Sequence, residues 1–184
     1  MSEAAVNHST SDPGRTIVLV LGMGRSGTSS LTRVLGLCGA AMPRTPLPPA
    51  KANNERGFWE PAPIVRAHDR ILERLGTTWD GPAPRGVPVR DEWVEELAGL
   101  VEDQFGEAQV LAVKDPRASR LVPLWKAVSE RLGARLTVVI ALRHPDEVAR
   151  SLANREGYDR EKSLRLWLGY TLSAERDTRD LPRV

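Results

Sequence analysis

The chain has 184 residues, of which 41% are hydrophobic and 27% charged, proportions typical of one globular domain that buries its own core. A formal net charge of only +2 gives no global field to attract nucleic acid, so anion recognition has to come from locally placed Arg and Lys side chains. No run approaches the ~18 apolar residues of a membrane span, and we expect a cytoplasmic protein with neither a nucleic-acid partner nor a membrane span.

The N-terminal residues are small and polar and contain no apolar segment of signal-peptide length. We expect a disordered N-terminus over residues 1–14 and a single domain over residues 15–184. Cys38, the one cysteine of the chain, has no partner for a disulfide. We expect it to be a small buried residue near the end of a helix.

Apolar strands and amphipathic helices alternate along the chain. Thr16 to Leu21 is a continuous, β-branched run closed by glycine, typical of a strand buried on both faces of a parallel sheet. A helix over 28–37 follows a glycine-rich turn, and the prolines of 40–56 predict a long surface loop. Two more strands are expected over 109–113 and 135–142, and more helices over 63–75, 92–105, 121–132, 146–154 and 159–177. The alternation predicts an α/β layered fold with a central parallel sheet, in which ligands bind beyond the carboxyl ends of the strands.

The glycine-rich turn has the spacing of a phosphate-binding loop. From Gly22, the pattern G-x-x-x-x-G-K-[S/T] is met at both glycines and at Ser29, but Thr28 occupies the lysine position. Successive backbone N–H groups and the positive end of the following helix bind an oxyanion in such a loop. The hydroxyl of Ser26 adds to those of Thr28 and Ser29. A glycine turn without a ligand is the alternative interpretation.

Arg25 supplies the cation inside this loop. An ATP-using enzyme places a lysine on the β- and γ-phosphates and coordinates magnesium beside it. A transferring sulfuryl group carries less negative charge, so fixed Arg, Lys and N–H donors can stabilise it without a metal. The pattern therefore favours sulfuryl over phosphoryl transfer. A nucleotide kinase or NTPase with a relocated lysine remains an alternative.

Three blocks of the sequence resemble the signature of the P-loop sulfotransferases, especially the bacterial and the carbohydrate or tyrosylprotein-type members. They are G-M-G-R-S-G-T-S-S-L, V-K-D-P-R and L-R-H-P-D-E-V-A-R-S-L. The resemblance covers about residues 16 to 177 and implies a P-loop NTPase-like three-layer fold. It implies 3′-phosphoadenosine 5′-phosphosulfate as the co-substrate, no metal, and a hydroxyl acceptor that is a small molecule, a sugar or a glycolipid.

The family normally continues with a strand and a glycine-containing loop beyond the last helix predicted here. The resemblance thus implies a chain that lacks its C-terminal part. A non-catalytic, truncated nucleotide-binding module is a further alternative, and a homo-oligomer is possible because another subunit would then complete the site.

The resemblance also assigns residues to the donor. Arg25 matches the basic residue that touches the sulfuryl and bridging oxygens, and Gly27, Thr28 and Ser29 match the donors to the 5′-phosphate; Gly24 and Ser26 belong to the same donor-binding loop. Arg143 and Ser151 match the pair that binds the 3′-phosphate. A physical argument agrees for Arg143, because a guanidinium at the end of a buried strand can meet a phosphate bidentately.

Glu60 is the candidate general base. It follows Phe58 and Trp59, whose apolar side chains could raise its pKa toward a useful value. The alternative is that Glu60 only caps the next helix. His68 is the rival base, although its position among apolar helix residues makes it more typical of a packed side chain.

Lys114 resembles the family's lysine that stabilises the transferring group. The alternative interpretation is that Lys114 only forms an ion pair with Asp115. Arg117 is expected either to orient Asp115 or to contact the acceptor. Trp59 and Trp79 lie in loop contexts and could line an acceptor pocket, whereas Trp93, Trp125 and Trp167 have the helical spacing of core residues.

Overall fold

The computed structural model describes residues 14–50 and 57–184. Its strands are β1 (Thr16–Leu21), β2 (Val110–Lys114) and β3 (Arg135–Ile140). They form a parallel sheet in the order β2-β1-β3. The expected α/β fold with a central parallel sheet is therefore present, and β1 is the middle strand.

The helices lie within a few residues of their predicted positions. They are α1 (Thr28–Leu37), α2 (Ala62–Arg74), α3 (Asp91–Phe105), α4 (Val122–Arg131), α5 (Pro145–Glu156) and α6 (Arg160–Asp177). One element was not predicted, the short 3₁₀ helix η1 (Pro116–Arg120) directly after β2. Asp115 caps η1, because its side chain accepts a hydrogen bond from the Arg117 backbone N–H.

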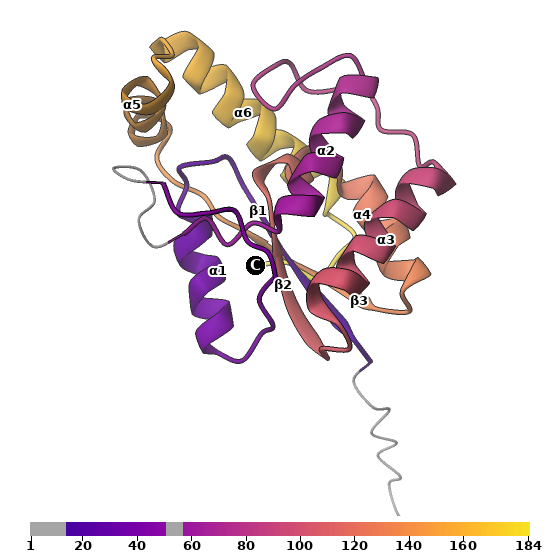
Figure 1. The fold of residues 1–184 in the computed structure, drawn as a ribbon. Helices are drawn as coiled ribbons and strands as arrows, with labels where there is room; N and C mark the ends of the chain where they lie inside the picture. The colour runs from indigo at the N-terminus through magenta and orange to yellow at the C-terminus, as the bar shows by residue number, and fades with distance from the viewer. Residues whose placement is uncertain (1–13, 51–56) are drawn as a thin grey trace, which may run out of the picture.

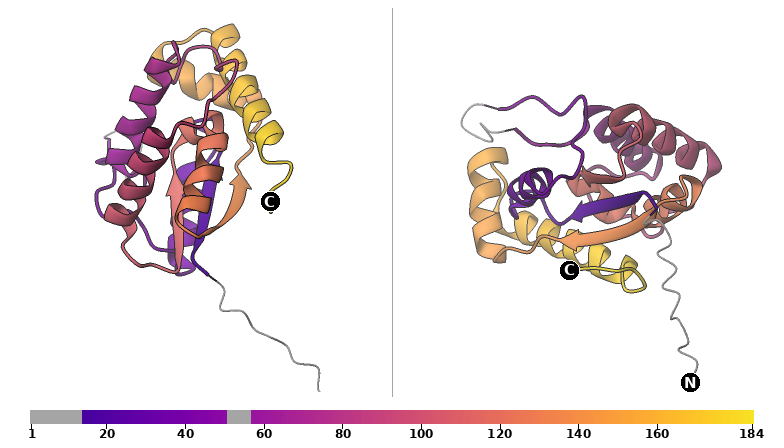
Figure 2. Two further views of the ribbon diagram at one scale, coloured as in Figure 1. Left: turned by 90° about the vertical axis from the view of Figure 1, so that its right-hand side faces the viewer. Right: turned by 90° about the horizontal axis from the view of Figure 1, so that it is seen from below.

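The sheet separates two layers of helices (Figures 1 and 2). Helix α1 packs against β1 and β2 on one face, while α3 and α4 pack together and cover the other. Alternate side chains of β1, Ile17, Leu19 and Leu21, belong to the larger core on the α3 and α4 side. Two-sided burial explains why β1 reads as an uninterrupted apolar run.

A second, smaller core holds α5 and α6 at the carboxyl end of the sheet. It consists of Met23 from the loop after β1, Val148 and Leu152 from α5, and Leu166 and Tyr170 from α6, all buried. The loop after β1 is thus packed directly against the α5–α6 pair.

Two segments extend the sheet edges. Ala41, after α1, forms a parallel bridge with Leu111 at the outer edge of β2. At the other edge, Val138 donates to the Pro182 carbonyl at 2.9 Å and accepts from the Val184 N–H at 3.0 Å. Residues 182–184 therefore run parallel to β3.

Two predictions about burial are wrong or partly wrong. Cys38 is exposed, not buried, because it follows the last turn of α1 on the outer surface. Trp93 and Trp125 are core residues as expected, but Trp167 is only half-buried. The prediction of a disordered N-terminus concerns residues outside the described part of the chain. Among the helices of the described residues, none is long and apolar enough to cross a membrane.

Gly22 joins β1 to the following loop in a conformation that suits only glycine. Its φ is +124°, and a Cβ built at this position would lie 2.4 Å from the Ala141 carbonyl oxygen. Its N–H donates to the Ser119 hydroxyl at 2.9 Å. Any side chain here would strain the backbone and push β1 away from the end of β3.

We predict that Gly22→Ala lowers the free energy of unfolding by roughly 1–3 kcal/mol or more, since strain and overlap combine. Gly99→Ala is the control, because Gly99 lies within α3 and a Cβ added there would meet open space within the described part of the chain. In the Gly99→Ala control, the free energy of unfolding should increase by roughly 0.5–1 kcal/mol. Urea unfolding of both variants measures the difference, and equal effects would contradict the role of Gly22.

Candidate functional site

The loop between β1 and α1 forms a backbone concavity at the carboxyl edge of the sheet. Arg25 and Gly27 both have left-handed backbone angles, with φ of 76° and 89°. Alternation of such angles with right-handed ones turns successive N–H groups toward one point. Among the described residues, no side chain caps α1, and its first turn contains no acidic residue. The first-turn amides of α1 therefore keep their capacity to bind an anion.

Ser26 adds a polar side chain that is buried in this loop. The residue is 8% exposed, and its hydroxyl has no hydrogen-bond partner within the described part of the chain. A buried hydroxyl without a partner is costly. A ligand oxygen in the loop would satisfy it.

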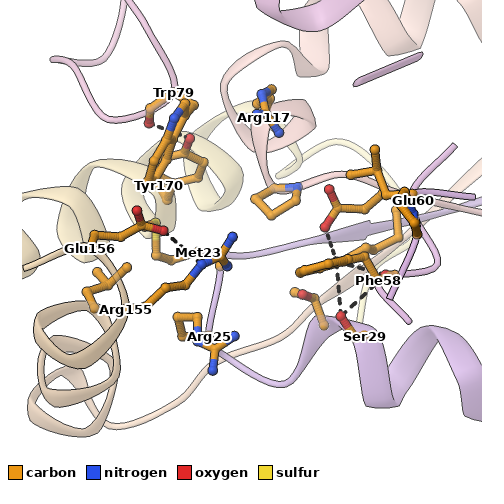
Figure 3. A pocket seen from close by; sticks show the side chains of 17 residues that line it. Met23, Arg25, Ser29, Phe58, Glu60, Trp79, Arg117, Arg155, Glu156 and Tyr170 are labelled. Carbon is orange, nitrogen blue, oxygen red and sulfur yellow. Dashed lines mark hydrogen bonds and ion pairs between the residues drawn. The ribbon is translucent and has the colours of Figure 1, made fainter. Parts of the chain in front are cut away.

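A cavity of about 500 Å³ opens beside the loop. Figure 3 shows Ser29, Phe58 and Glu60 on one side of it, Trp79, Tyr170 and Glu156 on the other, and Arg25 from the loop. The cavity is lined by Met23, Gly24, Arg25, Thr28, Ser29, Leu47, Pro48, Phe58, Glu60, Trp79, Lys114, Pro116, Arg117, Leu152, Arg155, Glu156 and Tyr170. Its volume is in the range of small-molecule sites.

Lys114 and Glu60 form a buried ion pair in the cavity wall. Their side chains are 2% and 8% exposed. The ammonium also donates to the Phe58 carbonyl at 3.1 Å and to the Ser29 hydroxyl at 3.2 Å. Burial raises the pKa of Glu60 above its ordinary value, although the Lys114 charge acts in the opposite direction. The Glu60 carboxylate is thus buried in the cavity wall and paired with one lysine.

This pairing overturns two of the alternatives considered from sequence. Glu60 does not cap α2, whose N-cap is Pro61, and no side chain of the described residues caps that helix. Lys114 pairs with Glu60 and not with its neighbour Asp115, which bonds Arg117 and His68 instead. The sequence placed Lys114 correctly at a strand end but could not show a partner 54 residues away.

His68 is poorly placed to act as the rival base. It is fully buried, and its Nδ1 lies 2.7 Å from an Asp115 carboxylate oxygen. Its Nε2 accepts from the Trp125 indole N–H at 3.2 Å. Because indole only donates, this nitrogen is unprotonated and already engaged. Both ring nitrogens of His68 therefore contact buried side chains, Asp115 and Trp125. Glu60 remains the candidate base.

Arg25, Arg143 and Ser151 come together although they are far apart in sequence. Arg25 Nε donates to the Ser151 hydroxyl at 2.8 Å, and Arg143 Nη1 donates to the Arg25 carbonyl at 3.2 Å. Burial, and then the nearby charges of Arg155 and Arg143, lower the pKa of Arg25. Arg143 and Arg155 also pair with Glu147 and Glu156 at 2.6 and 2.8 Å. Three guanidinium groups against these two carboxylates leave an excess of one positive charge at this end of the site.

The cavity itself brings together some of the residues predicted for the site. Gly24, Arg25, Thr28, Ser29, Glu60 and Lys114 line it, whereas Arg143 and Ser151 join it through hydrogen bonds with Arg25. Trp79 lines it too, while Trp59 lies under the Arg33 guanidinium at 5.3 Å.

Sequence reasoning missed Arg155 and Glu156, which line the cavity from the end of α5. Arg155 follows Ser151 by four positions, so a helical reading of this segment places both on one face. That spacing was the signal that could have identified Arg155. Tyr170 carried no comparable signal, because its contact with the cavity depends on how α6 packs.

No family model matches the chain, and neither a curated protein nor a solved structure matches it. Among the described residues, no three or more His, Cys, Asp or Glu side chains lie close enough together to hold a metal ion. The interpretation of the site therefore rests on its geometry and chemistry.

We predict that the Glu60 carboxyl titrates above 4.5, the ordinary value for glutamate, in a ¹³C-NMR pH titration. Glu60→Gln identifies its resonance by deleting it. A raised pKa means that the folded chain binds this proton more tightly than the unfolded chain. The stabilising contribution of the group is thus complete at low pH and decreases as pH rises through the folded-state pKa. A titration at or below 4.5 would contradict the burial argument.

Proposed function

We propose that the chain is a sulfotransferase that binds 3′-phosphoadenosine 5′-phosphosulfate at the loop after β1. One observation supports this proposal: two groups of residues lie near the first turn of α1. They are the cluster of Arg25, Ser151 and Arg143 and the Lys114–Glu60 ion pair. One end of the site thus suits several anionic groups, and the other holds a carboxylate that can take a proton. The resemblance to P-loop sulfotransferases, and with it a P-loop type of three-layer fold, agrees with this arrangement.

The donor supplies an activated sulfuryl group, and the residues of the chain handle charge and protons. The loop amides from Gly24 to Ser29 and the Arg25 guanidinium would bind the 5′-phosphosulfate. The Ser26 N–H is the exception, because it donates to the Met23 carbonyl at 3.1 Å. Arg143 and Ser151 would bind the 3′-phosphate. The acceptor oxygen forms a bond to sulfur as the bridging S–O bond breaks, Glu60 takes the acceptor's proton, and 3′-phosphoadenosine 5′-phosphate leaves with the bond's electrons.

Lys114 favours this reaction over the kinase or NTPase alternative. In ATP-using P-loop enzymes the Ser or Thr hydroxyl at the position of Ser29 coordinates magnesium. Here that hydroxyl accepts a hydrogen bond from the Lys114 ammonium at 3.2 Å. A divalent cation bound to the same oxygen would lie directly beside another positive charge. A fixed ammonium is instead suited to oxygens that gain charge during sulfuryl transfer.

Donor binding is tested by calorimetry with 3′-phosphoadenosine 5′-phosphate. We predict that Arg25→Ala and Arg143→Ala each weaken binding by roughly ten- to hundredfold, because a hydrogen bond to a charged group contributes about 1.5–3 kcal/mol. Arg135→Ala is the matched control, since Arg135 is exposed and begins β3 at the opposite end of the sheet. Unchanged binding in both site variants would refute the proposed pocket. Magnesium-dependent ATP turnover without affinity for this nucleotide would support the kinase or NTPase alternative.

The role of Glu60 is tested by following radioactive sulfate from the donor into an acceptor. We predict that Glu60→Gln lowers turnover by roughly 10²–10⁴-fold, the usual contribution of a general base. Donor affinity should stay within a fewfold of the wild type. Glu107→Gln, an exposed change outside the cavity, should have no effect. Full activity of Glu60→Gln would exclude Glu60 as the base.

A further inference from the structure

The two ends of the cavity differ in how their arginines are compensated. Arg25 lies near Arg143 and Arg155, and both lower its pKa in addition to the effect of burial. Arg117 is bound instead between two carboxylates, with its Nη1 at 3.0 Å from Asp115 and its Nε on Asp69. Burial opposes the charge of Arg117, but Asp115 and Asp69 outweigh it and raise its pKa.

These surroundings give the two arginines different binding properties. At the Arg25 end, Arg143 and Arg155 pair with Glu147 and Glu156. Three guanidinium groups against these two carboxylates leave an excess of one positive charge, which suits the anionic donor. Around Arg117, two carboxylates more than balance one guanidinium. Its fixed N–H groups can still donate to an uncharged oxygen. A bound donor would further repel a negatively charged acceptor across so short a distance.

Aromatic and apolar side chains line the cavity between these two ends. Trp79 and Tyr170 lie side by side in Figure 3, across from Phe58. The Tyr170 hydroxyl donates to the Trp79 carbonyl at 2.7 Å, and the Trp79 ring stacks on Tyr158 with centroids 6.2 Å apart. These contacts fix the orientation of Trp79. Leu47 and Pro48 continue the apolar wall beside Phe58.

Such walls favour flat apolar ligands over sugars. An aromatic ring gains contact area and stacking against Trp79 and Phe58. A sugar can also stack one face on an aromatic ring, but any of its hydroxyls that face Phe58, Leu47 and Pro48 would lack partners there, which is unfavourable. The volume of about 500 Å³ also has to hold the phosphosulfate, so the space left fits a compact molecule.

We propose that the acceptor is an uncharged hydroxylated compound with a flat, apolar body. Its hydroxyl would point to Glu60, and its ring system would lie between Phe58 and Trp79 near Arg117. This inference rests on the proposed sulfotransferase function, and it narrows the acceptor from small molecules, sugars and glycolipids in general to phenol-like compounds.

The test compares three probes by NMR titration of the full chain with 3′-phosphoadenosine 5′-phosphate present. The probes are 2-naphthol, 6-hydroxy-2-naphthoate and methyl β-glucoside. We expect 2-naphthol to bind at least about tenfold more tightly than the charged or the sugar probe. Intermolecular NOEs should connect its ring protons to the Trp79 indole. Tighter binding of the glucoside or the naphthoate, or NOEs to other regions only, would overturn the inference.

Variants provide a second readout. Trp79→Leu keeps an apolar side chain, so the fold is retained, but it removes the flat ring; 2-naphthol affinity should fall about fivefold or more. Leu168→Ala, an exposed change on α6, is the control and should leave affinity unchanged. Equal affinity in Trp79→Leu and wild type would also overturn the inference.

Failure of the inference and of the proposed function can be told apart by measuring the nucleotide alone. Nucleotide binding without a preference for 2-naphthol refutes only the acceptor class. A preference for 2-naphthol without nucleotide binding refutes the sulfotransferase proposal and, with it, the identification of the naphthol site as an acceptor site.

Discussion

The buried ion pair between Lys114 and Glu60 connects the elements on which the site depends. Lys114 ends β2, Glu60 precedes α2, and the ammonium also reaches Ser29 in the first turn of α1. Both charges are nearly inaccessible to water, so each requires the other. Removing one partner of such a pair costs about 3–5 kcal/mol because it leaves an uncompensated buried charge. Burial and pairing together hold the candidate base and the candidate electrostatic donor in one place.

The parallel sheet explains why distant segments meet there. In the register of the sheet, Val20 lies opposite Lys114, and Leu21 lies opposite Ile140. The loops that leave β1, β2 and β3 therefore start at the same edge, which is where ligands bind in open α/β sheets. Packing of Met23 against α5 and α6 then brings the Ser151 and Arg155 face of α5 over the loop.

Hydrophobic periodicity was sufficient to predict the strands and α-helices of the described residues, because burial on one or two faces leaves a regular pattern. It did not predict the short 3₁₀ helix η1. It was insufficient for Cys38, whose apolar neighbours suggested burial that the outer end of α1 does not provide. Loop position and hydroxyl content also identified the loop after β1, which lines the cavity, as the candidate anion-binding segment. The backbone angle of Arg25 had no signal in the sequence.

Long-range polar contacts were the part that sequence could not supply. The nearest carboxylate in sequence to Lys114 is Asp115, yet the structure pairs Lys114 with Glu60, and Asp115 with His68 and Arg117. The Arg25–Ser151 hydrogen bond spans 126 positions. The resemblance paired Arg143 with Ser151, but only the structure shows that both lie next to Arg25.

Binding of the phosphosulfate end of the donor by the loop after β1 can be observed residue by residue in ¹H–¹⁵N NMR spectra recorded with 3′-phosphoadenosine 5′-phosphate. We expect saturable shifts at the amides of Gly24 to Ser29 and near Arg143, with none at Arg135 at the far end of β3. Shifts confined to the separate hollow between Asp80 and Arg165, or no shifts at millimolar nucleotide, would contradict donor binding at this loop.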